Sequence, residues 1–344
     1  RGRDLKGLNK LRRVANYASF PFSSWLTSAC SRKRFDAVMC VQYSPVLMAM
    51  PALRIARTQG LPCLIYSFDL WPEDMLTGGL SREGVPYRIM RDVSKRIYGA
   101  ADAVAVTSPG FEDYFREELG LEGLDCPWLP QYAEDMFESA GAGPAPISAD
   151  GSVTFTFAGN VGGNQSVQTI VRAAAIAREK APMRVRVVGS GSRLEECRSL
   201  AAELGADNVE FPGRMPLEEM PALYASSDAM LLTLAKAEGG SLVSKYTIPR
   251  KLQSYLASGR PVVAATDGMA SRIVEEGDCG LAVPAEDPEA LAAAMVSFAE
   301  TEAEGRAAMG ARAKALYERE YSRERFFVSL GEILDGLVSK GRTK

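Results

Sequence analysis

Short apolar runs alternate with amphipathic, helix-like segments along the first part of this chain. Apolar runs of strand length occur at residues 36–41, 63–68, 103–107 and 126–129. Helical periodicity is found at residues 4–31, with a break near Pro21, and at 45–59, 87–98 and 109–118. Buried strands separated by helices are typical of parallel sheets, so this alternation predicts a doubly wound α/β domain.

The same alternation restarts after a stretch of Ala, Gly, Pro and Ser at residues 139–151. That composition is typical of a linker, so we predict domains at 1–138 and 152–322 on either side of it. The second domain has predicted strands at 153–157, 184–188, 209–211, 229–233 and 261–265. Its predicted helices cover 167–179, 193–204 and 217–225, and further helices begin at Pro249, Pro288 and Gly305. A last helix is predicted at 323–337.

Composition supports two domains and narrows the chemistry. A chain of 344 residues with 47% hydrophobic content can bury two cores. The six cysteines are scattered without a CxxC pair, which favours reduced core thiols in a cytosolic protein. The chain contains no histidine, which excludes a histidine base, a histidine-ligated metal and a Ser-His-Asp triad within it.

Charge is concentrated at the start of the chain. Residues 1–34 hold nine Lys or Arg against one Asp, a local charge of +8, although the whole chain carries −3. Phe20, Phe22 and Trp25 are interleaved with these basic residues. This combination predicts an interfacial segment on an anionic membrane, and the alternative is a helix that packs on its own domain with solvated charges. Nucleic-acid binding is not expected, because the rest of the chain is acidic and no binding module is recognisable.

Residues 238–265 combine a glycine-containing loop, a helix opened by Pro249, a stop at Gly259 and a buried strand. Proline is tolerated at a first helical turn because its missing N–H would be unpaired there. A helix N-terminus beside Arg250 and Lys251 suits a phosphate or pyrophosphate. The alternative is an ordinary amphipathic helix whose basic residues are merely solvated.

The same stretch resembles the donor-binding helix of the family 4 retaining glycosyltransferases of GT-B fold, particularly those of bacterial surface polysaccharides. The shared motif, Pro-x-Lys-Leu-x-x-Tyr-Leu-Ala-x-Gly-x-Pro-Val, is matched by Pro249, Lys251, Leu252, Tyr255, Leu256, Ala257, Gly259, Pro261 and Val262. The resemblance implies two Rossmann-like, doubly wound parallel-sheet domains facing across a cleft, with helix 323–344 packing back on the first domain. Such relatives open with further βα units, so it also implies a reduced N-terminal domain or a fragment.

On the donor side, Gly159, Asn160, Gly162 and Gly163 lie between a predicted strand and helix. Glycines let a backbone approach a phosphate, although a plain strand-to-helix turn has the same composition. By resemblance this loop faces the donor diphosphate, and Arg214 belongs to a loop that cups the nucleobase. An exposed loop arginine is the alternative for Arg214. The turn at 189–191 is expected to be mainly structural, with an edge contact to the base as the other interpretation.

The family's paired glutamates, seven residues apart, would fall at Tyr246 and Ser254 here, and neither is acidic. By resemblance the Ser254 position would bind the ribose, and its change leaves full activity open. Glu238, in the loop before the helix, is a candidate for a sugar contact instead. The predicted donor set therefore includes Glu238, Arg250, Lys251 and Ser254.

On the acceptor side, Asp69, Trp71, Pro72 and Glu73 resemble the relatives' Asp-Leu-Trp-Pro-Glu motif. They follow a predicted strand at its C-terminal end, where open α/β sheets bind ligands. A carboxylate there can bond sugar hydroxyls or orient an acceptor. The alternative is that Asp69 caps a turn and Trp71 is core. Many retaining relatives have a histidine directly before this aspartate, and this chain has Phe68.

We therefore predict Asp69, Glu73 and Lys251 as catalytic residues. No Asp-x-Asp pair occurs, so Lys251, Arg250 and a helix dipole are expected to hold the diphosphate without a metal or other cofactor. The resemblance implies transfer of a sugar, most simply UDP-linked, to a lipid-linked or polysaccharide acceptor with retention. It places the protein in the cytoplasm, peripheral at the inner face of the plasma membrane, in cell-surface polysaccharide biosynthesis.

Two alternatives remain open. A non-catalytic GT-B protein that binds a nucleotide sugar or saccharide, or that partners an active transferase, would explain Tyr246 and Ser254. A nucleotide-sugar epimerase of the same fold is less favoured, because the histidines and additional carboxylates of that chemistry are not evident. Fold alone does not separate these functions.

Overall fold

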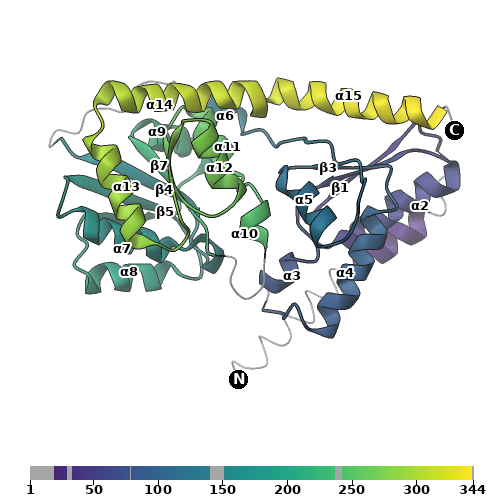
Figure 1. Ribbon diagram of the computed structural model, residues 1–344, viewed down its shortest axis with the longest axis horizontal. Coiled ribbons are helices and arrows are strands. Elements are labelled where there is room, and N and C mark those ends of the chain that lie inside the picture. Colours follow the sequence, from purple (N-terminus) through teal and green to yellow (C-terminus); the bar gives the residue numbers. More distant parts are fainter. Residues whose placement is uncertain (1–18, 29–32, 78, 140–150, 237–241, 343–344) are drawn as a thin grey trace. The chain divides into compact units, whose positions relative to one another are not determined.

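The computed structural model describes residues 19–28, 33–77, 79–139, 151–236 and 242–342. The chain forms two compact units (Figure 1). The first combines Arg1–Pro130, Gly239–Tyr246 and Phe327–Lys344, and the second combines Gln131–Glu238 and Thr247–Phe326. The linker predicted at 139–151 lies outside the described residues except at its two ends.

The first unit contains a parallel sheet of three strands in the order β1-β2-β3. These are β1 (Val38–Gln42), β2 (Cys63–Ser67) and β3 (Ala103–Val106), and all three were predicted from their apolar runs. The predicted strand at 126–129 is wrong, because it forms only an isolated bridge between Trp128 and Val106. Pro127 has no N–H to donate, which prevents a regular ladder there.

Aromatic side chains dominate the core of the first unit. Tyr98, Phe111, Tyr114 and Phe115 pack together there, and Tyr246 joins them from a distant part of the chain. The helices of this unit are η1 (Val46–Ala49), α2 (Met50–Gln59), α3 (Asp74–Thr77), α4 (Val85–Tyr98), α5 (Gly110–Glu117) and α10 (Val243–Tyr246). A loop was expected where α10 forms.

The second unit contains a parallel sheet of six strands in the order β6-β5-β4-β7-β8-β9. They are β4 (Val153–Asn160), β5 (Met183–Ser190), β6 (Val209–Gly213), β7 (Ala229–Thr233), β8 (Val262–Ala265) and β9 (Gly280–Val283). The strand order reverses between β4 and β7. This is the doubly wound pattern predicted from the sequence, and such sheets bind ligands at the C-terminal ends of the strands beside the reversal.

Helices cover both faces of this sheet (Figure 1). On one face, α7 (Val167–Ala177), α8 (Leu194–Glu203) and α13 (Pro288–Glu300) bury Phe155 and Phe157. On the other face lies α11 (Lys251–Ala257), whose Tyr255 hydroxyl donates to the carbonyl of Ala158 at 3.1 Å. The remaining elements are α6 (Asp135–Ser139), η2 (Gly163–Gln165), η3 (Leu217–Glu219), α9 (Met220–Ala225), α12 (Met269–Glu276), α14 (Ala303–Leu316), a π-helical turn (Tyr317–Tyr321) and α15 (Arg323–Arg342).

The helix α15 begins in the second unit, and its residues from Phe327 onward belong to the first. Within the first unit, Lys340 forms an ion pair with Asp125, with Nζ and Oδ2 3.3 Å apart. In the described ranges, no helix has both the length and the apolarity needed to cross a bilayer.

Candidate functional site

The loops that follow β4 and β5 are held together by glycines. Gly159 and Gly189 lie opposite each other in the sheet with φ of 151° and 145°. A Cβ on Gly189 would overlap the carbonyl of Gly159, and one on Gly191 would overlap the carbonyl of Val161. These glycines therefore permit a close backbone approach, which supports the mainly structural role predicted for the turn at 189–191.

A cavity of about 280 Å³ lies at the ends of these two loops. It brings together Gly159 and Asn160 of the glycine loop with Arg214, which was predicted from a separate sequence motif. Its remaining lining residues are Val188, Gly189, Ser190, Met215 and Met220. Apolar walls with a few polar groups suit a planar, polar-edged molecule such as a nucleobase. The methionines were not predicted, because their apolar character marks them equally well as core.

Lys251 lies at the reversal of the strand order. Its Nζ donates to the amide oxygen of Gln165 and lies 4.2 Å from the ring centroid of Phe157. Gln165 directly follows the glycine loop, and its carbonyl accepts from the hydroxyl of Thr233 at the end of β7, at 2.5 Å. The ammonium is thus placed between the ends of β4 and β7.

No carboxylate forms an ion pair with Lys251 among the described residues. Burial lowers the pKa of its ammonium to about 7. A charged group withdrawn from water is costly unless an opposite charge accompanies it. The site therefore favours an anionic ligand at Lys251.

The helix at Lys251 begins later than predicted. Arg250 is the N-cap of α11, and Pro249 precedes it. The backbone N–H of Leu252 donates to the carbonyl of Pro249 at 2.9 Å, so Pro249 belongs to a turn that leads into the helix. Arg250 is exposed and pairs with Glu134, with Nη2 and Oε1 3.0 Å apart. Its charge is therefore at the surface, unlike that of Lys251.

The two positions that would carry the glutamate pair are not together in one unit. Ser254 is 6% exposed within α11, so little of it is available to a ligand. Tyr246 belongs to the first unit, where its hydroxyl donates to Glu117 at 3.0 Å and its carbonyl accepts from Ser108 at 2.5 Å. Glu238 lies outside the described residues. The burial of Ser254 therefore disfavours the direct ligand contact that was predicted for it.

Two residues that the sequence did not indicate have unusual backbone conformations. Ser166 and Glu286 adopt φ of 43° and 54°, in the left-handed region that non-glycine residues rarely enter. The Ser166 hydroxyl donates to the Glu286 carboxylate at 3.2 Å. Glu286 is exposed and follows β9, so it provides a carboxylate at the C-terminal edge of the sheet. No motif singles it out, because only the fold brings it near Ser166.

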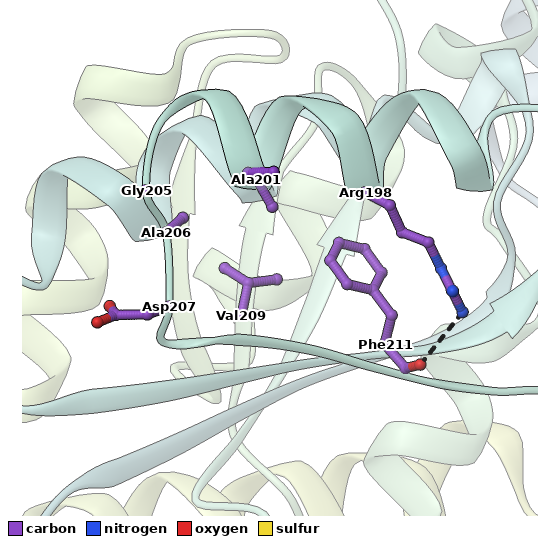
Figure 2. Close-up of a pocket in the computed structure, with 8 residues that line it drawn as sticks. Arg198, Ala201, Gly205, Ala206, Asp207, Val209 and Phe211 are labelled. Carbon is purple, nitrogen blue, oxygen red and sulfur yellow. Dashed lines mark hydrogen bonds between the residues drawn. The ribbon is translucent and has the colours of Figure 1, made fainter.

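A second cavity, of about 340 Å³, lies between α8 and β6 (Figure 2). Val209 and Phe211 of β6 point toward Ala201 of α8, and Arg198 donates to the Phe211 carbonyl at 3.4 Å. None of the predicted site residues lines this space. It is an apolar gap beneath a helix at the edge of the sheet.

In the first unit, Asp69 forms a polar cluster at the C-terminal ends of β1 and β2. The Ser44 hydroxyl donates to Asp69 Oδ2 at 2.6 Å and lies 3.4 Å from Asp74 Oδ2. Trp71 is 5% exposed, as its core interpretation predicts, and its Nε1 donates to the Ser44 oxygen at 3.0 Å. Burial, and then the charge of Asp69, raise the pKa of Asp74 to about 7. Asp74 was not predicted, although it directly follows Glu73.

Aromatic rings adjoin this cluster. Phe68 precedes Asp69, and its ring centroid lies 4.6 Å from that of Tyr43, which is half exposed and precedes Ser44. Carboxylates can bond sugar hydroxyls, and an exposed ring can pack on the apolar face of a sugar. The cluster therefore has the chemistry of a saccharide-binding surface.

Glu73 is fully buried, unlike Asp69. Its Oε1 accepts from Arg82 at 2.7 Å, from the Tyr87 hydroxyl at 2.5 Å and from the Tyr114 hydroxyl at 3.2 Å. Its Oε2 accepts from the backbone N–H of Leu242 at 2.9 Å. This environment favours a structural role for Glu73, and its catalytic role stays a prediction. The carboxylate anchors the segment that contains α10 to the first unit.

Comparison with known families matches both parts of the chain. Residues 2–124 match a model described as glycosyl transferase 4-like domain, and residues 152–301 match one described as glycosyl transferases group 1. A probable glycosyltransferase of Pseudomonas aeruginosa, WbjE, is 28% identical over 286 residues, which cover 80% of this chain and 68% of that protein. A GDP-mannose-dependent phosphatidylinositol monomannoside mannosyltransferase of Mycolicibacterium smegmatis is 32% identical, but the match covers only 37% of this chain and 33% of that protein.

Solved structures share the fold. The Anabaena protein HepE, in complex with UDP and glucose, has a TM-score of 0.68 at 14% identity, with 94% of this chain and 83% of that chain covered. Sucrose-phosphate synthase from Thermosynechococcus elongatus has a TM-score of 0.69 at 18% identity, with 94% and 79% covered. These neighbours and the two parallel sheets confirm the predicted two-domain, Rossmann-like GT-B fold.

Proposed function

We propose that this chain, which its family models and relatives support as a glycosyltransferase of the GT-B family, transfers a sugar from a nucleoside-diphosphate donor to a saccharide acceptor. The observation that carries the proposal is the ammonium of Lys251. It has no paired carboxylate among the described residues and lies where the strand order reverses, beside the glycine loop. An anionic donor would supply the missing charge.

The donor would be held by the second unit. Its base would occupy the cavity that Asn160 and Arg214 line, and its diphosphate would lie by Lys251, with Arg250 as a second, exposed cation. During transfer, the bond between the sugar C1 and the diphosphate oxygen breaks, C1 bonds to the acceptor hydroxyl oxygen, and the proton of that hydroxyl passes to the departing diphosphate. Negative charge develops on the departing diphosphate, and a charged Lys251 would stabilise it. We therefore propose a reaction that is independent of metal.

The acceptor would be held by the first unit. Asp69, with Ser44 and Asp74, would bond its hydroxyls, and Tyr43 would offer an exposed ring. We propose a UDP-sugar donor, since HepE was solved with UDP, and a lipid-linked or polysaccharide acceptor, since one relative is named for a phosphatidylinositol mannoside. Transfer with retention, at the cytoplasmic face of the plasma membrane and in surface-polysaccharide synthesis, completes the proposal.

A second candidate function is favoured by one observation. Tyr246 and Ser254 are both buried and neither is acidic, so no carboxylate stands at the positions of the family's glutamate pair. A non-catalytic protein that binds a nucleotide sugar would tolerate this. Such a protein would bind nucleoside diphosphates and their sugars without hydrolysing or transferring the sugar.

Calorimetric titration with UDP, GDP and ADP tests the donor site. Lys251→Ala removes a charge-assisted hydrogen bond and should weaken binding by roughly ten- to a hundredfold. Lys251→Arg should recover part of that loss, because it keeps the charge with a different geometry. Lys180→Ala, an exposed lysine beyond the far end of α7, is the matched control and should bind as the wild type does.

The titration can also refute the proposal. If no nucleoside diphosphate binds at millimolar concentration, the transferase assignment is wrong. If UDP binds equally well to Lys251→Ala, the donor diphosphate does not lie at Lys251. Binding of a UDP-sugar without turnover would favour the non-catalytic function.

A further inference from the structure

Residues 19–28, with the sequence SFPFSSWLTS, are helical and include no charged side chain. Its large apolar side chains are exposed: Phe20 at 55%, Phe22 at 65%, Trp25 at 38% and Leu26 at 48%. A surface helix of a globular protein normally buries its apolar residues and exposes charged ones. This helix exposes its apolar residues instead, which indicates a surface for contact with an apolar medium.

Three of the polar side chains of residues 19–28 bond to backbone carbonyls of the same helix. The Ser23 hydroxyl donates to the Phe20 carbonyl at 3.2 Å, that of Thr27 to the Ser23 carbonyl at 3.1 Å, and that of Ser28 to the Trp25 carbonyl at 2.7 Å. Transfer out of water costs less free energy for a hydroxyl that already has a hydrogen-bond partner in the protein than for one that bonds only to water. The helix can therefore enter a poorly hydrated layer at small cost.

The helix is attached to the first unit through Trp25. The Arg54 guanidinium of α2 lies 3.9 Å from the centroid of the Trp25 ring, and its Nη1 donates to the Trp25 carbonyl at 3.4 Å. This attachment leaves Phe20 and Phe22 exposed. The exposed rings of residues 19–28 fit a segment that lies at the surface of a bilayer.

Positive charge accompanies the exposed rings. Lys33 and Arg34 are exposed a few residues after the helix, and Phe35 beside them is 43% exposed. Residues 1–34 together carry +8. Such a charge is attracted to anionic lipid and would repel the same surface on a second copy of the chain. The occupant of this surface is therefore a lipid bilayer rather than another copy.

We infer that the helix over residues 19–28 inserts its apolar side chains into the surface of an anionic bilayer and holds the first unit there. The inference deepens the membrane location proposed above by naming the inserting element. It does not depend on sugar transfer, so it is tested without a donor or an acceptor.

The test uses the whole chain with vesicles of phosphatidylcholine, either pure or mixed with phosphatidylglycerol. Binding to the anionic vesicles should be at least about tenfold tighter, and salt should weaken it. Bound protein should show a blue shift of tryptophan emission and quenching by brominated acyl chains. Trp25→Phe should still bind but lose that signal, because Trp71 is buried at 5% exposure and Trp128 is partly buried.

The double variant Phe20→Ser/Phe22→Ser should bind anionic vesicles about tenfold or more weakly. Its matched control is Leu217→Ser, which removes a 47% exposed apolar side chain from the second unit and should not change binding. Circular dichroism and UDP titration of the same preparations show that the double variant is folded. They also separate a failure of this inference from a failure of the donor site.

Several results would overturn the inference. One is a wild-type protein that binds neither vesicle, or both equally. Others are a double variant that binds as the wild type does, or bound protein whose Trp25 emission is not quenched. A wild-type dimer in solution that the double variant abolishes would identify a second copy, not a bilayer, as the occupant.

Discussion

The two units of this protein differ in what they leave exposed. Among the described residues, fourteen large apolar side chains are exposed, and thirteen of them belong to the first unit. Leu217 is the single one in the second unit. Both units bury polar groups in their interiors; in the first unit, Gln42 accepts from Ser67 at 2.7 Å and from Tyr98 at 3.0 Å.

The two units therefore form their binding surfaces in different ways. The second unit fixes the position of its cavity with backbone, because close-packed glycines hold the loops after β4 and β5 together, although most of the lining residues contribute side chains. The first unit presents side chains: exposed rings, paired carboxylates and an uncharged helix. A rigid backbone site suits a ligand of constant structure such as a nucleoside diphosphate. A side-chain surface is more easily altered, which suits an acceptor and a membrane.

The largest expected effect tests the rigidity of the second unit. Gly189→Ala places a methyl group against the carbonyl of Gly159 at a φ of 145°, so the two loops cannot keep their spacing. We expect a loss of more than about 4 kcal/mol in the free energy of unfolding, measured by urea titration. Gly163→Ala is the control, because a Cβ there meets nothing within 4 Å. Similar stability for both variants would show that the close approach is not needed.

The architecture was predictable from the sequence because its signals are local. Buried parallel strands appear as short apolar runs, and the order of strands and helices follows from their alternation. The run at 126–129 was misread as a strand because Pro127 interrupts the ladder although the residues are apolar. Boundaries such as that of α11 shift by a residue or two because turns form ahead of a helix.

Part of the candidate site was predictable from local sequence patterns. The loop at Gly159 and Asn160 and the basic pair at 250–251 stand out in the sequence because glycines after a strand and basic residues at the start of a helix suit a phosphate, although both patterns also have structural interpretations. Glu73 and Asp74 are neighbours in sequence, yet one is a buried anchor and the other lies beside Asp69. The different roles of Glu73 and Asp74 depend on their tertiary contacts, which the sequence does not show. Glu286 has no sequence signal for the same reason.

The next prediction contrasts how the two units respond to pH. Asp74 has a pKa of about 7 in the folded protein and about 3.9 when unfolded, so the folded first unit binds an extra proton between these values. Its stability should fall as pH rises from about 4 to 7. Lys251 has a pKa of about 7 folded and about 10.4 unfolded, so the unfolded chain binds the extra proton, and the second unit should gain stability from about pH 7 to 10.

Each change should amount to about 4 kcal/mol in urea titrations over pH. Asp74→Asn should remove the loss below pH 7 and leave the gain above it, and Lys251→Met should do the reverse. If both variants changed the stability over the same pH range, these two groups would not titrate as described. Affinity for UDP should also fall above pH 7, because the free protein then holds Lys251 uncharged.

The smallest expected effect concerns Arg250, the exposed neighbour of Lys251. Its ion pair with Glu134 joins side chains that are 60% and 36% exposed, so Arg250→Ala should change the free energy of unfolding by less than about 1 kcal/mol. Its effect on UDP affinity should be at most roughly fivefold and should vanish at high salt, because exposed charges are screened. The effect of Lys251→Ala should persist at high salt, since that ammonium is enclosed by Phe157 and Gln165. Glu134→Gln, which frees Arg250, should raise the affinity slightly at low salt. A salt-independent loss in Arg250→Ala as large as that in Lys251→Ala would show that the exposed arginine, not the enclosed lysine, is the main contact of the diphosphate.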